Sequence, residues 1–347
     1  MTITRTTCGF RARSASTLIL MLGLVGGCSA ARPEASCTVS AKLVPSCGAL
    51  WGYSAVNSGP ADLRRVEQDM GRRFDFVYRF HDINDGVPDS EERSLAESGT
   101  ILHLALDPRD HANKQAGITW SDVASGRYDQ TLRQQAAGVA ALRTPVFLTF
   151  DHEVDQPAKA ASGTAADFVA AWRHVHDLFL AAGASNAVWV WVVLGWEETF
   201  ARAGELWPGN DVVDWISWDV YNAAGCRAGM VDLGKRQTFA EGLLPFFRWL
   251  HTNGTRYGID TRKPLMISEA GSIQADPTGS ARWYEEIPAV LREHPQIKAV
   301  TLWSGVGNGV CDYVFTNDAT LSSAVRRAGL DPWVNALPDD ARPRSGP

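Results

Sequence analysis

Along most of the chain, short apolar runs rich in β-branched and aromatic residues alternate with longer segments whose apolar positions recur with a helical period. The runs predict eight strands, at 49–53, 74–80, 101–106, 146–150, 187–193, 213–218, 264–268 and 297–303. The longer segments predict helices at 62–70, 128–142, 165–182, 238–250, 281–292 and 321–328. Alternating strands and helices are typical of a parallel sheet covered by helices. Eight repeats in one chain predict a single (β/α)8 barrel of the α/β class.

The N-terminal residues break this pattern and predict a targeting segment. A stretch with three arginines precedes an apolar run at 18–25, and two glycines stand directly before Cys28. This order is typical of a lipoprotein signal peptide, in which Cys28 receives the lipid after cleavage. The alternative is an ordinary secretory signal in which Cys28 is incidental. Either way we expect export, as a lipoprotein of the bacterial cell membrane or as a secreted protein.

The same segment sets the expected domain boundaries. After cleavage about 320 residues remain, which suits one large barrel better than two small domains. The stretch that follows Cys28 is rich in Ala, Ser and Pro and shows no helical period. We therefore expect a signal peptide at 1–27, a tether at 28–46, the barrel at 47–335 and a C-terminal tail at 336–347.

Cysteine usage supports export. Once Cys8 is removed with the signal peptide and Cys28 is acylated, an even number of cysteines remains, namely Cys37, Cys47, Cys226 and Cys311. An even number outside the cytoplasm predicts two disulfides. Of the three possible pairings, proximity favours Cys37–Cys47, which leaves Cys226–Cys311. No CxxC pair or His-Cys spacing indicates zinc, so we expect no metal and no other cofactor.

The charge and the aromatic content of the chain limit the classes of partner that it is expected to bind. The chain has 33 basic and 39 acidic residues, a net charge of −6 and no basic run, so nucleic acid is not an expected partner. Its 13 tryptophans are many for this length. Most should belong to the core, but flat aromatic faces also suit the apolar faces of sugar rings.

Polar residues cluster at the ends of the predicted strands. The carboxyl ends carry His81 and Asp82, Asp107, Asp151 with His152 and Glu153, Asp219 with Tyr221, and Glu269. The amino-terminal ends of the strands carry residues without an obvious chemical role, such as Thr144, Pro145, Asn186 and Lys263. Active sites of (β/α)8 barrels lie at the carboxyl ends of the strands. The asymmetry therefore predicts an active site at that face of the barrel.

Two glutamates at this face indicate glycoside hydrolysis. Glu153 follows the fourth strand and Glu269 ends the seventh, so their carboxyl groups can face each other across the barrel mouth. Such a pair supplies the acid and the nucleophile of a glycosidase, and a separation of about 5–5.5 Å predicts retention of configuration. Either glutamate alone would more simply be a cap or a salt-bridge partner. A zinc-protease reading of His152-Glu153 fails, because Gln156 stands where the second histidine is required.

Three sequence blocks resemble glycoside hydrolase family 26, whose members are retaining (β/α)8 enzymes. The segment at 152–155 reads His-Glu-Val-Asp and resembles the acid/base block, and the segment at 263–272 reads Lys-Pro-Leu-Met-Ile-Ser-Glu-Ala-Gly-Ser and resembles the nucleophile block. A third block runs from Trp207 through Trp215 to Asn222. The blocks stand in the family's order on the matching strands, and the resemblance covers about 48–315.

The resemblance implies roles for individual residues. Glu153 would be the acid/base and Glu269 the nucleophile. His152 would contact the sugar, Tyr221 would hydrogen-bond the nucleophile and keep it ionised, and Trp303 would form a platform under the sugar. Further candidate substrate contacts near the same strand ends are His81, Asp82, Trp196 and Asp219.

Departures from the family pattern leave the substrate open. The strand reads Thr149-Phe150-Asp151 where the family usually has an arginine before His-Glu. Gln156-Pro157 replaces a glycine and an aromatic residue, and Leu194 stands where an asparagine is expected. We expect an endo-β-1,4-mannanase, because mannanases are the commonest members of the family, acting as a monomer on β-linked polysaccharide or oligosaccharide. A β-1,3-xylanase or mixed-linkage β-glucanase is the alternative within the fold. A lipoprotein that binds envelope glycan without cleaving it is the alternative outside enzymes.

Overall fold

A computed structural model describes residues 37–55, 60–112, 117–224, 226, 236–307, 311–335 and 337. The expected signal peptide, the lipidation site at Cys28 and the tail from 338 onward lie outside the described residues. No described helix is both long enough and apolar enough to cross a bilayer.

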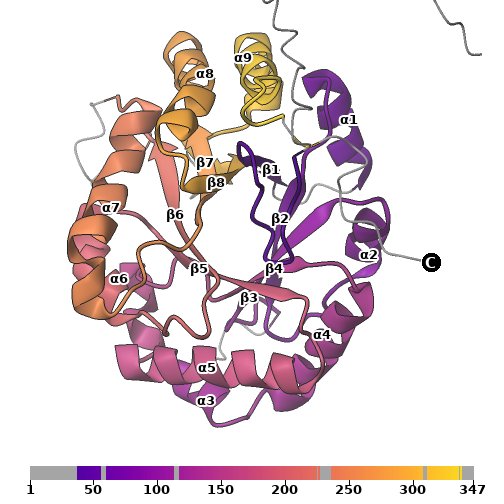
Figure 1. The fold of residues 1–347 in the computed structure, drawn as a ribbon, viewed down its shortest axis with the longest axis vertical. Helices are drawn as coiled ribbons and strands as arrows, with labels where there is room; N and C mark the ends of the chain where they lie inside the picture. Colours follow the sequence, from indigo (N-terminus) through magenta and orange to yellow (C-terminus); the bar gives the residue numbers. More distant parts are fainter. Residues whose placement is uncertain are drawn as a thin grey trace, which may run out of the picture. The chain divides into compact units, whose positions relative to one another are not determined.

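Eight parallel strands close into a barrel, as predicted (Figure 1). The strands are β1 (Leu50–Ala55), β2 (Phe76–Asp82), β3 (Ile101–Asp107), β4 (Val146–Phe150), β5 (Ala187–Val193), β6 (Trp215–Asn222), β7 (Leu265–Ser272) and β8 (Ile297–Ser304). Each strand pairs with the next, and β1 pairs with β8 from Leu50 opposite Ala299 to Ala55 opposite Ser304. The (β/α)8 prediction is confirmed.

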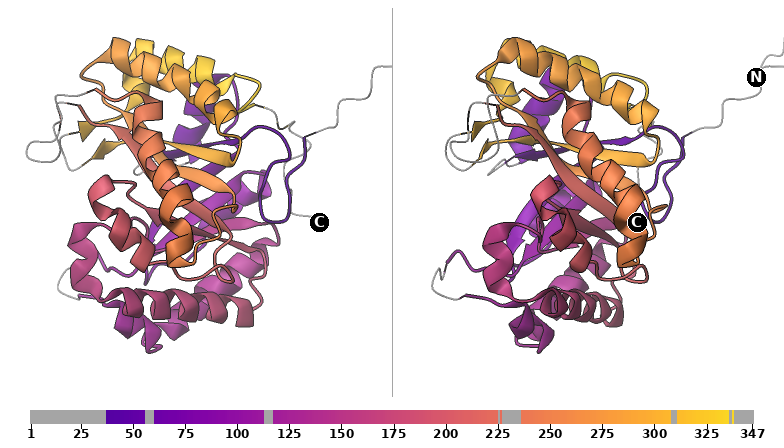
Figure 2. Two further views of the ribbon diagram at one scale, coloured as in Figure 1. Left: turned by 60° about the vertical axis from the view of Figure 1, so that its left-hand side comes forward. Right: turned by 90° about the vertical axis from the view of Figure 1, so that its left-hand side faces the viewer.

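Helices lie outside the strands in every view (Figures 1 and 2). They are α1 (Pro60–Met70), α2 (Ser90–Glu97), α3 (Trp120–Ala124), α4 (Asp129–Leu142), α5 (Ala165–Ala181), α6 (Phe200–Glu205), α7 (Phe239–Asn253), α8 (Pro277–Glu293) and α9 (Ala319–Gly329). Helices α1, α4, α5, α7, α8 and α9 were predicted, whereas the short helices α2, α3 and α6 were not. Shorter pieces complete the set: the 3-10 helices η1 (Pro157–Ser162), η2 (Glu197–Thr199), η3 (Gly254–Tyr257) and η4 (Phe315–Asn317), and a hairpin of β9 (Val306–Gly307) with β10 (Cys311–Asp312).

Strands β6 and β7 extend four residues beyond their predicted ends, to Asn222 and Ser272. Their pairing shifts register at Trp218/Asp219 and then continues from Asp219 opposite Glu269 to Asn222 opposite Ser272. Most of the extra residues are polar or small, so a search for apolar runs did not include them. The shift matters for the site because it places Asp219 and Glu269 side by side.

Residues 37–46 belong to the barrel rather than to a tether, so the predicted boundary at 47 is ten residues too late. Leu43 is fully buried and packs in one cluster with the first inward-facing residues of the strands, among them Phe76 and Trp215. The Trp215 indole Nε1 donates to the Lys42 carbonyl at 2.7 Å. The predicted disulfide Cys37–Cys47 is formed. It closes this segment, indigo in Figure 2, into a loop at the amino-terminal end of the barrel.

Candidate active site

The carboxyl ends of the strands surround a pocket of about 650 Å³. Both predicted catalytic glutamates line it, together with His152, Tyr221, Trp196 and Trp303. The other lining residues are Phe80, Arg109, Gln156, Pro157, Ala158, Leu194, Val306, Gly307 and Tyr313. Side chains that lie far apart in the sequence therefore meet in one concave site at the predicted face.

Glu269 lies on β7 and is 7% exposed. The Tyr221 hydroxyl, on the neighbouring strand β6, donates to Glu269 Oε2, which is the contact expected from the sequence. Burial and the charge of Glu153 raise the pKa of Glu269 to about 7, against the opposing effects of His152 and of the tyrosine hydrogen bond. Tyr221 thus favours the ionised carboxylate, although the net shift is upward.

Glu153 sits on the tight turn that follows β4. Both Asp151 and Glu153 adopt left-handed backbone conformations, with φ of 57° and 48°. Each such residue costs about 1–2 kcal/mol when it is not glycine, so surrounding contacts must hold the turn. The Gln156 side-chain amide donates to Glu153 Oε2 at 2.9 Å. The turn directs the Glu153 carboxyl group into the pocket.

A third carboxyl group lies beside the pair. Asp219 is 5% exposed, and the Ser268 hydroxyl donates to its Oδ1 at 2.7 Å. Burial and the charges of Glu269 and Glu153 hold the pKa of Asp219 well above its ordinary value. The same surroundings therefore favour the protonated form of Asp219.

His152 is fixed from the end of β3. Its Nδ1 lies 2.8 Å from Asp107 Oδ1, and its backbone N–H donates to the same oxygen at 3.1 Å. Burial disfavours the imidazolium, but the Asp107 charge outweighs it and raises the pKa of His152. The Arg109 guanidinium, which lines the pocket, forms an ion pair with Asp107 at 2.8 Å. The imidazole ring of His152 is therefore fixed in place beside Glu153, and its protonated form is favoured.

Asp155 connects the turn that carries Glu153 to the end of β5. Its carboxyl oxygens accept from the Leu194 backbone N–H at 2.8 Å and from the Thr199 hydroxyl at 2.6 Å. Burial raises the pKa of Asp155 to about 6, while these hydrogen bonds oppose the shift. The contacts fix the β5 loop, which carries Leu194 and Trp196 to the pocket wall.

An aromatic wall closes the side of the pocket next to Glu269. Tyr221 lies 4.8 Å from Tyr313 and 6.1 Å from Trp303, measured between ring centroids. These rings pack in a small hydrophobic cluster with Cys311 and Cys226, whose disulfide is formed as predicted. The disulfide and the β9–β10 hairpin therefore support the side of the pocket that holds Glu269.

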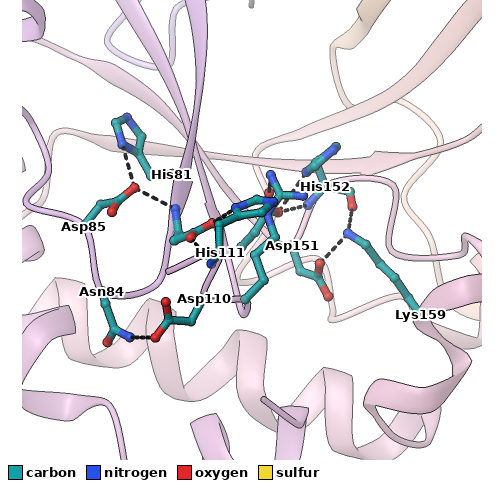
Figure 3. Close-up of polar contacts among 11 residues, drawn as sticks. His81, Asn84, Asp85, Asp110, His111, Asp151, His152 and Lys159 are labelled. Carbon is teal, nitrogen blue, oxygen red and sulfur yellow. Dashed lines mark hydrogen bonds and ion pairs between the residues drawn. The ribbon is translucent and has the colours of Figure 1, made fainter. Parts of the chain in front are cut away.

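Of the predicted substrate contacts, Asp219 lies beside Glu269 but does not line the pocket, and neither do His81 and Asp82. His81 Nε2 lies 2.7 Å from Glu92 Oε1 on α2, and Asp82 accepts from His111 Nδ1 at 2.7 Å. Figure 3 shows His81 paired with Asp85, in the loop after β2. His81 and Asp82 both end a barrel strand, as the sequence analysis required, but their polar atoms are used to fix neighbouring loops.

Several lining residues were missed in the sequence. Arg109 lies two residues beyond Asp107 and carries a charge, so an extended search after β3 would have found it. Tyr313 lies two residues after Cys311, and the disulfide predicted for Cys311 was the feature of the sequence that could have pointed to it. Among the described residues, no group of three or more His, Cys, Asp or Glu side chains is arranged to hold a metal ion.

We expect Tyr221→Phe to shift the acid limb of the pH–rate profile to higher pH. The tyrosine hydroxyl stabilises the ionised form of Glu269, so its loss raises the pKa of Glu269, and the carboxylate form is lost at a higher pH. A hydrogen bond to a charged group contributes about 1.5–3 kcal/mol, equivalent to roughly one to two pH units. The profile of kcat/KM measures the shift. Tyr257→Phe, in the outer helix layer, is the matched control, and an acid limb that stays in place would contradict this role.

Comparison with known proteins supports the fold. No protein-family model matches the chain. Solved structures of similar fold include the catalytic domain of a Bacillus sp. JAMB-750 GH26 endo-β-1,4-mannanase (TM-score 0.61, 16% identity, covering 83% of this chain and 88% of that one). A Cellulomonas fimi endo-β-1,4-mannanase double mutant is also similar (TM-score 0.60, 16% identity, covering 86% and 74%). The barrel is thus built like those of family 26 enzymes.

Curated relatives match by sequence over shorter shares of their length. Endoglucanase H of Acetivibrio thermocellus is 26% identical over 254 residues, which is 70% of this chain and 26% of that protein. The β-1,3-xylanase TXYA of a Vibrio species is 30% identical over 108 residues, which is 30% of this chain and 23% of that protein. The chain thus spans about a quarter of the length of these relatives.

Proposed function

We propose that the protein is a retaining glycoside hydrolase that acts on β-linked polysaccharide. The observation that carries the proposal is the meeting of Glu153 and Glu269 in one pocket, with Tyr221 donating to the Glu269 carboxylate. The two glutamates come from opposite parts of the barrel, after β4 and on β7. A pair of carboxyl groups on either side of a glycosidic bond is the requirement of this chemistry.

In the proposed reaction, Glu153 donates its proton to the departing glycosidic oxygen while a Glu269 carboxylate oxygen bonds to the anomeric carbon. The C–O bond to the leaving sugar breaks, and a covalent glycosyl-enzyme forms. Glu153, now ionised, takes a proton from water, whose oxygen attacks the same carbon and releases Glu269. His152 and Arg109 bind hydroxyl groups of the substrate, and Trp303 provides an aromatic surface for a sugar ring.

The proposed substrate is a β-1,4-mannan, cleaved within the chain. This choice is supported by the solved structures of similar fold, several of which are described as endo-β-1,4-mannanases. A β-1,3-xylan and a β-glucan are the alternatives, since the curated relatives are named as a β-1,3-xylanase and an endoglucanase. Leu194, Gln156 and Pro157 line the pocket, so the departures noted in the sequence fall where substrates would be distinguished.

The test is incubation of the purified barrel with reduced manno-, xylo- and mixed-linkage gluco-oligosaccharides, with products separated by chromatography. Proton NMR of the first-formed product distinguishes retention from inversion. Shorter products of retained configuration from one series support the proposal and identify the sugar. A folded protein that binds a glycan and releases no product from any series would instead be the non-catalytic glycan-binding protein.

We propose further that the chain is exported and attached to the cell membrane through a lipid on Cys28. The basic stretch, the apolar run and the two glycines before Cys28 support this proposal. Both disulfides also suit a compartment outside the cytoplasm. We expect radiolabelled palmitate to enter the native chain and not a Cys28→Ser variant. Equal labelling of both would remove Cys28 from this role.

A further inference from the structure

The turn that carries Glu153 is held by a buried cation. Lys159 lies on η1, six residues beyond Glu153, and its side chain is 17% exposed. Its ammonium group donates to Asp151 Oδ1 and to the backbone carbonyl of His152. Figure 3 shows Lys159 reaching back to both residues. One side chain therefore binds the two residues that come directly before the proposed acid/base.

Other groups of the turn also have hydrogen-bond partners, and Lys159 adds to these contacts. The indole Nε1 of Trp120, a fully buried residue on α3, donates to Asp151 Oδ2 at 2.6 Å. The His152 backbone N–H donates to Asp107. Asp151, with its left-handed backbone, thus has one carboxylate oxygen on Trp120 and the other on Lys159. The carbonyl of His152, one bond from Glu153, has Lys159 as its donor.

Electrostatics keeps this lysine charged. Burial disfavours the ammonium form, but the nearby carboxylates of Asp151 and Asp107 outweigh it and raise the pKa of Lys159. Removing one partner of such a buried pair leaves the other charge uncompensated. The positive charge that holds this turn therefore comes from residue 159, further along the chain.

We propose that Lys159 is a positioning residue for the acid/base: it holds the strained turn after β4 and thereby sets the direction of the Glu153 carboxyl group. The inference rests on the proposed glycosidase function. Lys159 does not line the pocket, so it acts through the turn rather than on the sugar. Its loss should displace Glu153 and weaken proton donation, while Glu269 on the opposite strand stays in place.

Leaving-group dependence separates this role from a merely structural one. Release of a sugar needs a proton from Glu153, whereas release of dinitrophenolate, a stable anion, needs little help. In Lys159→Met we expect kcat/KM to fall about 100-fold for a reduced oligosaccharide, as for a misplaced catalytic group, and less than about threefold for the dinitrophenyl glycoside of the same sugar. Loss of folded protein would lower both rates by the same factor.

Two further variants complete the experiment. In Asp151→Asn with Lys159→Met, no uncompensated carboxylate is buried, so this protein should fold even if the single variant does not, and it should show the same split between substrates. Lys42→Met removes a lysine that pairs with Asp214 under the barrel, far along the chain from the turn, and should change neither rate. Circular dichroism and the melting temperature report the folded state of each.

The outcomes distinguish the inference from the function on which it rests. If the native protein cleaves neither substrate, the proposed function fails and the role of Lys159 falls with it. If the native protein is active and the folded double variant loses both rates equally, or loses neither, the glycosidase function stands and the positioning role is wrong. A loss confined to the oligosaccharide supports both.

Discussion

Glu269→Ala is expected to lower kcat by several powers of ten on every substrate, because it removes the atom that attacks the anomeric carbon. Loss of a nucleophile is among the largest single effects in enzymes that form a covalent intermediate. The fall should be the same for good and poor leaving groups, since both reactions need the attack. The pocket loses a buried carboxyl group that is 7% exposed, so the variant should fold and still bind glycan.

Azide gives this prediction a positive signal. A small anion can occupy the space left by the Glu269 carboxylate and attack the anomeric carbon, so added azide should restore part of the rate and produce a glycosyl azide of inverted configuration. Glu285→Ala removes an exposed glutamate that pairs with Arg327 on the outer helices, and it should leave the rate unchanged. Undiminished turnover in Glu269→Ala would assign the nucleophile to another residue.

The second large effect is expected from Glu153→Ala. Without the proton donor, cleavage of an oligosaccharide should fall by about 10²–10⁴-fold, which is the usual contribution of general acid catalysis. The first step on a dinitrophenyl glycoside should be nearly preserved. The second step lacks its base, so the glycosyl-enzyme should accumulate and a burst of dinitrophenolate should precede slow turnover.

Rapid-mixing kinetics measure this burst, and mass spectrometry of the quenched protein detects the added sugar on Glu269. Azide should here give a product of retained configuration, which contrasts with the outcome in Glu269→Ala. Glu293→Ala, at the exposed end of α8, is the matched control. Equal losses on both substrates, without a burst, would contradict the acid/base assignment.

The barrel itself could be predicted from the sequence because its strands are buried on both faces. Runs such as Ala187–Val193, in which every residue is buried, stand out against helices of regular period. Helix α2 was missed because its sequence Ser-Glu-Glu-Arg-Ser-Leu-Ala-Glu has few apolar positions, and its start depends on the Asp89 cap. Residues 37–46 were missed because composition alone resembles a linker, whereas the burial of Leu43 depends on the barrel end it meets.

The residues of the candidate site also divide into those that could be predicted from the sequence and those that could not. Glu153, Tyr221 and Glu269 were predictable because strand ends of a barrel converge and motif residues mark them. Lys159 was not, because its contacts depend on how η1 returns to the turn after β4. His81 and Asp82 satisfied the strand-end rule yet lie outside the pocket, because Glu92 and His111 reach them from neighbouring segments. Position along a strand therefore predicts which residues can reach a site, and the loops decide which of them do.

The loop closed by Cys37–Cys47 also determines how a polymer can move through this protein. Leu43 and the inward-facing rings of Phe76, Phe147 and Trp215 fill the amino-terminal end of the barrel. A glycan therefore cannot thread along the barrel axis, and both of its ends must pass sideways over the rim of the mouth. Substrate therefore enters and products leave on the same face of the barrel, the one that carries the pocket.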